Sequence, residues 1–149
     1  MPIVAVELPH AGVVGLPLVS SIVPNLLIGG SMNGIALPET IQHLVSLCGV
    51  TAYEIGHPIR SVTLVWLYDD PEREVPGFIE PLARWVAGCI EDHPTLVHCQ
   101  AGFNRSALVA ARALMLRGRT ADEAIALIRR QRSEHCLFNW RFEAWLRSR

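Results

Sequence analysis

The sequence has no lysine: all 13 basic residues are arginine, and with 14 acidic residues the formal net charge is −1. This balance lacks the basic surface of a dedicated nucleic-acid-binding protein, so we do not expect nucleic acid as a partner. No apolar run reaches the roughly 18 residues that cross a membrane. The chain also does not begin with a basic run before an apolar block, as a secretory signal does. We therefore expect a cytoplasmic protein without a membrane partner.

Cysteines are few, and no two of them form a CxxC pair: they are Cys48, Cys89, Cys99 and Cys136. This spacing argues against a zinc site. Half of the residues are apolar, so the chain has material for a core without a disulfide framework. We expect four free thiols, no metal and no cofactor, and ask whether one thiol is placed for chemistry.

Strand and helix patterns alternate along the 149 residues. Apolar and β-branched runs predict strands at 19–23, 26–29, 50–55, 61–67 and 95–98. Helical spacing of apolar residues predicts helices at 38–48, 76–91, 105–116, 120–130 and 138–146. The alternation predicts a single compact α/β domain, with a central, mostly parallel sheet of four or five strands flanked by helices.

One segment carries a chemical signal: His98-Cys99-Gln100-Ala101-Gly102-Phe103-Asn104-Arg105-Ser106. It joins a buried strand to an apolar helix, at the edge of the sheet where α/β proteins place ligands. A short loop there directs successive N–H groups inward as an anion-binding nest, and the positive end of the helix strengthens it. We expect the backbone from Gln100 to Arg105 to bind phosphate.

The side chains of this segment suggest distinct roles. Arg105 has a planar guanidinium that pairs with two phosphate oxygens. The same positive field favours the thiolate of Cys99, which is the nucleophilic form. Ser106 is placed to donate a hydrogen bond to the sulfur when it leaves. We interpret His98 as support for the loop rather than as an acid or base.

The leaving oxygen also needs a proton donor. Asp69 and Asp70 follow the predicted strand 61–67, whose carboxyl end would lie on the same edge as the loop if that strand were beside 95–98. Turn formation before Pro71 is the competing interpretation of this pair. Spacing alone leaves either aspartate possible.

The segment resembles the HCxxGxxR(S/T) signature of the cysteine-based phosphatases, and HCQAG is especially similar to the dual-specificity protein phosphatases. Residues 22–29 and 47–51 resemble the family's opening strands and its helix-to-strand step, and Asn139, Phe142 and Leu146 resemble its closing motif. Residues 1–18 are rich in proline and glycine and predict an N-terminal lead-in arm or strand, and the resemblance implies a catalytic domain over 19–149. It also favours Asp69 as the general acid, because this residue lies 30 positions before Cys99.

The resemblance implies hydrolysis of a phosphate monoester through a phosphocysteine, with phosphorylated protein or peptide as the substrate. No insertion for a deep phosphotyrosine cleft is present, which implies a site open to phosphotyrosine, phosphoserine and phosphothreonine. Asn104 stands where the family usually has serine, and the run from Gly102 to Arg105 resembles RNA 5′-triphosphatases. The alternatives are therefore a non-protein substrate (an RNA 5′-triphosphate end, a phosphoinositide or a sugar phosphate) or a non-catalytic phosphoprotein-binding module.

Overall fold

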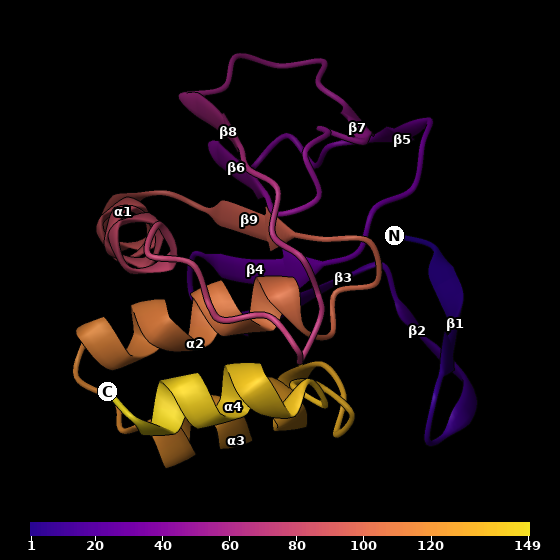
Figure 1. Cartoon of the computed structure of the whole chain (residues 1–149). Coiled ribbons are helices and arrows are strands. Elements are labelled where there is room, and N and C mark those ends of the chain that lie inside the picture. Colours follow the sequence, from indigo (N-terminus) through magenta and orange to yellow (C-terminus); the bar gives the residue numbers. More distant parts are fainter.

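Five strands form the central sheet, in the order β3 (Val19–Val23), β4 (Leu26–Gly29), β9 (Thr95–His98), β6 (His43–Ser46) and β8 (Ser61–Leu64). The computed structural model describes all residues, 1–149. Only β3 and β4 pair in antiparallel fashion, and the other pairings are parallel. The carboxyl ends of β4, β9, β6 and β8 therefore meet at one edge (Figure 1). This confirms the predicted α/β class and the mostly parallel sheet.

The four helices gather on one side of the sheet (Figure 1): α1 (Ile79–Asp92), α2 (Arg105–Leu116), α3 (Ala121–Gln131) and α4 (Trp140–Arg147). Helix α2 contacts β4 and β9 as well as the other three helices. Every residue from Arg105 to Ala111 is buried, which explains why this helix is apolar on nearly all sides. The central position of α2 fixes its first residue at the carboxyl edge of β9.

Residues 38–48 do not form the predicted helix, because residues 43–46 are the strand β6. Leu44 packs with Leu96 in one apolar cluster, whereas Val45 packs with Val97 in another. A strand covered on both faces has a continuous apolar run, and such a run also fits helical spacing. This ambiguity explains the incorrect prediction.

The position of β6 between β9 and β8 also determines where β8 lies in the sheet. Strand β8 pairs with β6 and therefore lies one strand away from β9 instead of beside it. The strand predicted at 61–67 ends at Leu64, and the strand predicted at 50–55 is reduced to β7 (Tyr53–Glu54). β7 pairs with β5 (Ile35–Ala36), and this segment covers the face of the sheet opposite the helices, where Leu37, Ile41 and Tyr53 pack on Leu44 and Leu96.

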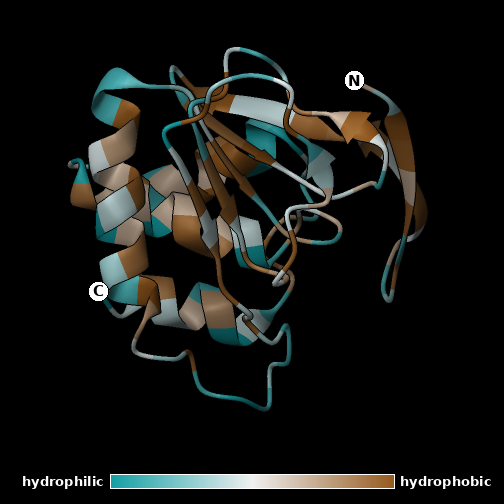
Figure 2. Ribbon diagram, turned by 90° about the horizontal axis from the view of Figure 1, so that it is seen from above, coloured by the Kyte–Doolittle hydropathy of each residue, from teal (hydrophilic) through white to brown (hydrophobic).

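Residues 1–18 form an antiparallel hairpin of β1 (Ile3–Leu8) and β2 (Gly12–Pro17). The hairpin lies beside the end of the sheet (Figure 1), and its strands are largely coloured as hydrophobic in Figure 2. Leu8 and Leu16 are buried in the main apolar core. The hairpin is therefore packed against the domain.

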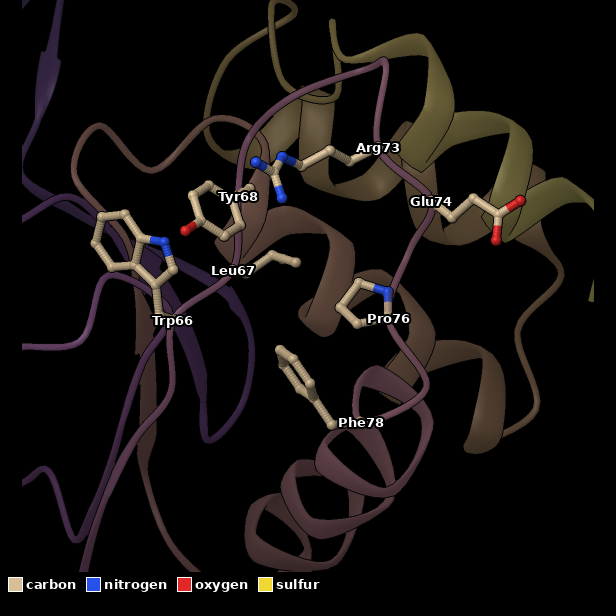
Figure 3. Close-up of a pocket in the computed structure, with 7 residues that line it drawn as sticks. All are labelled: Trp66, Leu67, Tyr68, Arg73, Glu74, Pro76 and Phe78. Atoms are coloured by element: carbon tan, nitrogen blue, oxygen red, sulfur yellow. The ribbon is translucent and has the colours of Figure 1, made fainter.

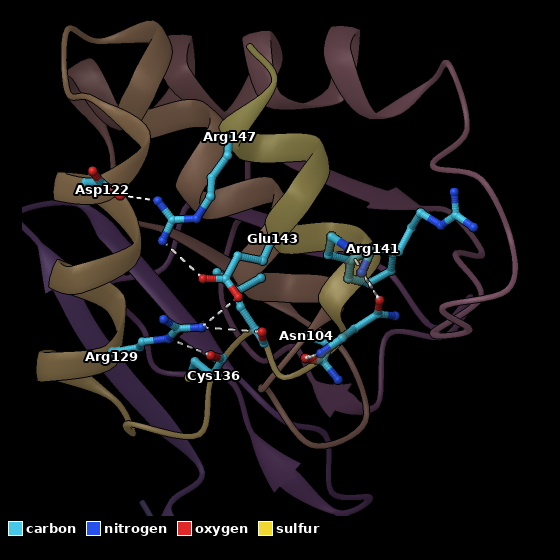
Figure 4. Close-up of polar contacts among 10 residues, drawn as sticks. Asn104, Asp122, Arg129, Cys136, Arg141, Glu143 and Arg147 are labelled. Atoms are coloured by element: carbon cyan, nitrogen blue, oxygen red, sulfur yellow. Dashed lines mark hydrogen bonds and ion pairs between the residues drawn. The ribbon is translucent and has the colours of Figure 1, made fainter.

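Polar contacts between α3 and α4 fix the segment that joins these helices (Figure 4). Glu143 pairs with Arg129 at 3.3 Å and with Arg147 at 3.1 Å, and Arg147 also pairs with Asp122. Arg129 Nε donates to the carbonyl of Cys136 at 3.0 Å. The longest helix, α1, has 14 residues, and no helix is both long and apolar enough to span a membrane.

Candidate active site

The loop between β9 and α2 has a row of backbone N–H groups without backbone acceptors. Gln100, Ala101, Phe103 and Asn104 donate to no carbonyl, whereas Cys99 at the end of β9 donates to Gly29 at 3.1 Å. Consecutive unpaired N–H groups in a turning loop form an anion-binding concavity. The loop therefore has the donors that a phosphate group needs.

Gly102 allows the loop to turn against the neighbouring strand β4. Its φ is 75°, in the left-handed region, and a Cβ built there would lie 2.6 Å from the carbonyl carbon of Gly29. Any other residue would strain the backbone and collide with β4. The glycine also brings its N–H to 3.2 Å from the sulfur of Cys99.

Cys99 lies at the base of a small hollow of about 130 Å³. Its side chain is buried, and Sγ lies 3.5 Å from the hydroxyl of Ser106. The hollow is also lined by Asp69, Arg105 and the loop residues Gln100, Ala101, Phe103 and Asn104. The structure thus brings the predicted nucleophile, arginine and proton donor to one place.

Arg105 lines this hollow, and not all of its hydrogen-bond donors are paired within the protein. One terminal nitrogen donates to Gln100 Oε1 at 2.9 Å, and the other donates to the carbonyl of Leu67 at 3.3 Å. Its Nε is buried and has no partner in the protein. Since a buried donor of a charged group is costly to leave unpaired, this nitrogen is suited to an anion.

The two aspartates of the loop after β8 have different environments. Asp69 lines the hollow, and its two carboxylate oxygens accept from Asn104 Nδ2 at 3.0 Å and from Asn139 Nδ2 at 2.8 Å. Asp70 instead accepts from the backbone N–H of Glu72 at 2.9 Å and lies 3.5 Å from Arg73. Asp70 therefore serves the turn, and only Asp69 faces Cys99.

His98 is fully buried behind the loop. Its Nδ1 lies 3.4 Å from the carbonyl oxygen of Cys99, and its ring meets that of Tyr53 edge-on. Burial lowers the pKa of His98 to about 4, so the imidazole is neutral at neutral pH. This environment is that of a support for the loop.

Arg132 is a second buried arginine of the site, and it lies outside the segment from His98 to Ser106. Its guanidinium donates to the loop carbonyls of Gly102 at 2.7 Å and Ala101 at 3.1 Å. It also donates to the carbonyl of Pro17 and to Ser20 Oγ, both at 3.0 Å. Arg132 therefore binds the carbonyl groups of the loop and not its N–H groups, which remain available to an anion. No sequence spacing pointed to this role.

A larger hollow, of about 440 Å³, lies next to the site beyond Leu67. Figure 3 shows the rings of Trp66, Tyr68 and Phe78 around it. Trp66 also lies 5.8 Å from the Arg105 guanidinium, and Arg73 lies 4.0 Å from the ring of Tyr68. The segment that leads to Asp69 thus carries two half-exposed aromatic rings, Trp66 and Tyr68, at this second hollow.

Known proteins of the same fold are similar to this chain. A mouse putative dual specificity phosphatase, crystallised with zinc tungstate, has a TM-score of 0.71 at 22% identity, over 89% of this chain and 87% of its own. Human DUSP28 has a TM-score of 0.70 at 19% identity, over 87% and 95%. The human tyrosine phosphatase-like serine/threonine/tyrosine-interacting protein has a TM-score of 0.69 at 20% identity, over 87% and 93%. At these identities the likeness shows the fold.

The family itself is shown by the sequence. No curated protein matches the chain. The family model described as "Dual specificity phosphatase, catalytic domain" matches residues 41–148, which include Asp69, Cys99 and Arg105. The chain therefore belongs to the dual specificity phosphatase family, with its catalytic domain over most of the sequence.

Proposed function

We propose that this protein is a metal-independent, cysteine-dependent phosphatase that removes phosphate from phosphotyrosine, phosphoserine and phosphothreonine in proteins. The observation that carries the proposal is the single hollow of about 130 Å³ lined by Cys99, Arg105 and Asp69. It combines a nucleophile, an anion clamp and a proton donor, which are the three groups that this reaction needs.

In the first step, the thiolate of Cys99 attacks phosphorus and the bond from phosphorus to the substrate oxygen breaks. The S–P bond forms as the carboxyl group of Asp69 gives its proton to the departing oxygen, so the product leaves as a neutral alcohol or phenol. Arg105 and the free N–H groups of Gln100, Ala101, Phe103 and Asn104 bind the other phosphate oxygens, where charge spreads in the transition state.

In the second step, water attacks the phosphocysteine and Asp69, now a carboxylate, takes a proton from it. The S–P bond breaks and inorganic phosphate forms. Ser106, 3.5 Å from the sulfur, donates a hydrogen bond to the thiolate as it leaves. The second step returns Cys99 as thiolate and Asp69 as acid.

Asn104 bears on the choice of substrate. Its amide is engaged within the protein, since Nδ2 donates to Asp69 and Oδ1 accepts from the N–H of Asn139 at 3.1 Å. The asparagine therefore has a role that does not require an RNA 5′-triphosphate.

The test is hydrolysis of a small aryl phosphate in EDTA by the wild type and by Cys99→Ser. We expect turnover by the wild type and its loss in the variant, with the fold of both verified by circular dichroism. A folded but inactive wild type that binds phosphopeptides tightly would replace this proposal with the binding-module alternative. Comparison of phosphopeptides with 5′-triphosphorylated RNA then tests the substrate class.

A further inference from the structure

The hairpin leaves one edge of β1 without a partner strand. β1 pairs with β2 along residues 3–8, and these two strands form a sheet of their own. The opposite edge of β1 therefore presents unpaired N–H and C=O groups. Such an edge is a template for another extended chain.

A groove of about 480 Å³ follows this edge. It is lined by the five consecutive residues from Ile3 to Glu7, and on other sides by Leu18, Ser31, Met32, Gln100 and Ala101. Because side chains alternate between the faces of a strand, a groove lined by consecutive residues runs along the edge. The groove is thus placed to receive main-chain hydrogen bonds.

The groove is continuous with the hollow that holds Cys99. Val6, Glu7, Gln100 and Ala101 line both of them. With a rise of about 3.3 Å per residue, the strand from Glu7 back to Ile3 spans roughly 13 Å. The groove therefore accommodates about four extended residues that lead away from the hollow.

We propose that the phosphoprotein substrate binds as an added β-strand on the free edge of β1, with its phosphoresidue in the Cys99 hollow. This inference rests on the proposed function and deepens it. Main-chain pairing would supply affinity on one side of the phosphoresidue, and the groove would receive alternate side chains. Its lining is mostly apolar, from Ile3, Val4, Val6 and Met32, which favours apolar substrate residues there.

Glu7 gives the groove a charge preference at its junction with the hollow. It is exposed, and none of the salt bridges of the structure involves it. An exposed pair of opposite charges contributes up to about 1 kcal/mol, which corresponds to roughly fivefold in kcat/KM. We expect a basic residue next to the phosphoresidue to be preferred over an acidic one by about this factor.

The first test is a scan of backbone N-methylation through a phosphopeptide, on both sides of the phosphoresidue. On one side, every second N-methyl group should lower kcat/KM about tenfold, because it removes a donor and blocks pairing. The positions between should change little, because their N–H groups point away from β1. A uniform response at all positions would contradict strand pairing.

The second test exchanges charge between enzyme and peptide. Glu7→Arg should reverse the preference between peptides with arginine or glutamate beside the phosphoresidue, whereas Asp92→Arg should not. Asp92 is a matched control because it is exposed at the end of α1, close to the start of β9, whereas Cys99 follows the end of β9. An unchanged preference in Glu7→Arg would overturn the role of Glu7.

Two further outcomes separate this inference from the proposed function. If the wild type hydrolyses an aryl phosphate but the methylation scan is flat, only the docking inference fails. If the wild type hydrolyses neither the aryl phosphate nor the phosphopeptides, the proposed function fails. If sedimentation shows a dimer and Ala5→Pro dissociates it, a second copy of the chain occupies the free edge of β1. This result would also overturn the inference.

Discussion

The amide of Asn104 donates to Oδ2 of Asp69 at 3.0 Å, and this bond joins the Cys99 loop to the loop that follows β8. Asn139, which caps α4, donates to the other oxygen of Asp69 at 2.8 Å. The backbone N–H of Asn139 also donates to Asn104 Oδ1 at 3.1 Å. Two side chains from separate parts of the chain thus fix the position of the Asp69 carboxyl group.

The first prediction separates the two aspartates. Asp69→Asn should lower kcat about 100-fold, because it removes the proton donor and the base. Asp70→Asn should change kcat by less than about threefold, since Asp70 accepts only from its own turn. The loss in Asp69→Asn should shrink with aryl phosphates whose leaving groups need no proton. The opposite ranking of the two variants would contradict the assignment.

The second prediction concerns Asn104 as a positioning residue. Asn104→Ala should lower kcat about tenfold, because the carboxyl group of Asp69 loses one of its two amide donors. The same substitution made in Asp69→Asn should have little further effect, since the two changes act through one group. If the loss of kcat in the double variant equals the product of the two single losses, Asn104 acts by another route.

The third prediction concerns Arg132 and stability. Arg132→Leu should lower the free energy of unfolding by about 3 kcal/mol, because it leaves the carbonyls of Ala101, Gly102 and Pro17 without their donor. Arg130→Leu is the matched control, since Arg130 is exposed at the end of the same helix. Urea unfolding measures both, and equal midpoints for the two variants would refute this role.

The fourth prediction is a pH dependence from His98. Its pKa is 6.5 in an unfolded chain and about 4 in the folded protein. Between these values the unfolded state binds more protons, so stability is complete above pH 6.5 and falls as the pH falls towards 4. The loss should reach about 2 kcal/mol at pH 5. His98→Gln should flatten urea-derived stability between pH 7 and 5, and an unchanged slope would mean that His98 is not the cause.

Sequence reasoning predicted the strands 19–23, 26–29 and 95–98 and the start of α2 because local rules decide them. Pro24 and Asn25 mark a turn, and Thr120 with Glu123 forms a capping box at the start of α3. The segment 38–48 failed because burial on both sides of a strand has the same apolar pattern as a buried helix. Only the pairing of β6 with β9, distant in sequence, decides between them.

The candidate site likewise combines residues that a local pattern predicts with residues that only long-range packing brings to it. The cysteine, the arginine and the glycine lie in one contiguous loop, so their spacing carried the signal. Arg132 and Asn139 reach the site only through the packing of α3 and α4 against α2, which local patterns do not encode. The wall that β1 adds to the hollow likewise depends on long-range packing, since Val6, Glu7 and Leu8 lie more than ninety positions before the loop.

The central claim is that phosphate passes through the sulfur of Cys99, and trapping the intermediate tests it most directly. Ser106→Ala should slow the second step, because the sulfur leaves without its hydrogen-bond donor. The variant is mixed with an aryl phosphate, quenched in denaturant and examined by mass spectrometry. We expect one phosphoryl group on the peptide that contains Cys99, and none in Ser106→Ala combined with Cys99→Ser. Rapid turnover by Ser106→Ala with phosphate on another residue, or with hydrolysis that persists without Cys99, would contradict the account.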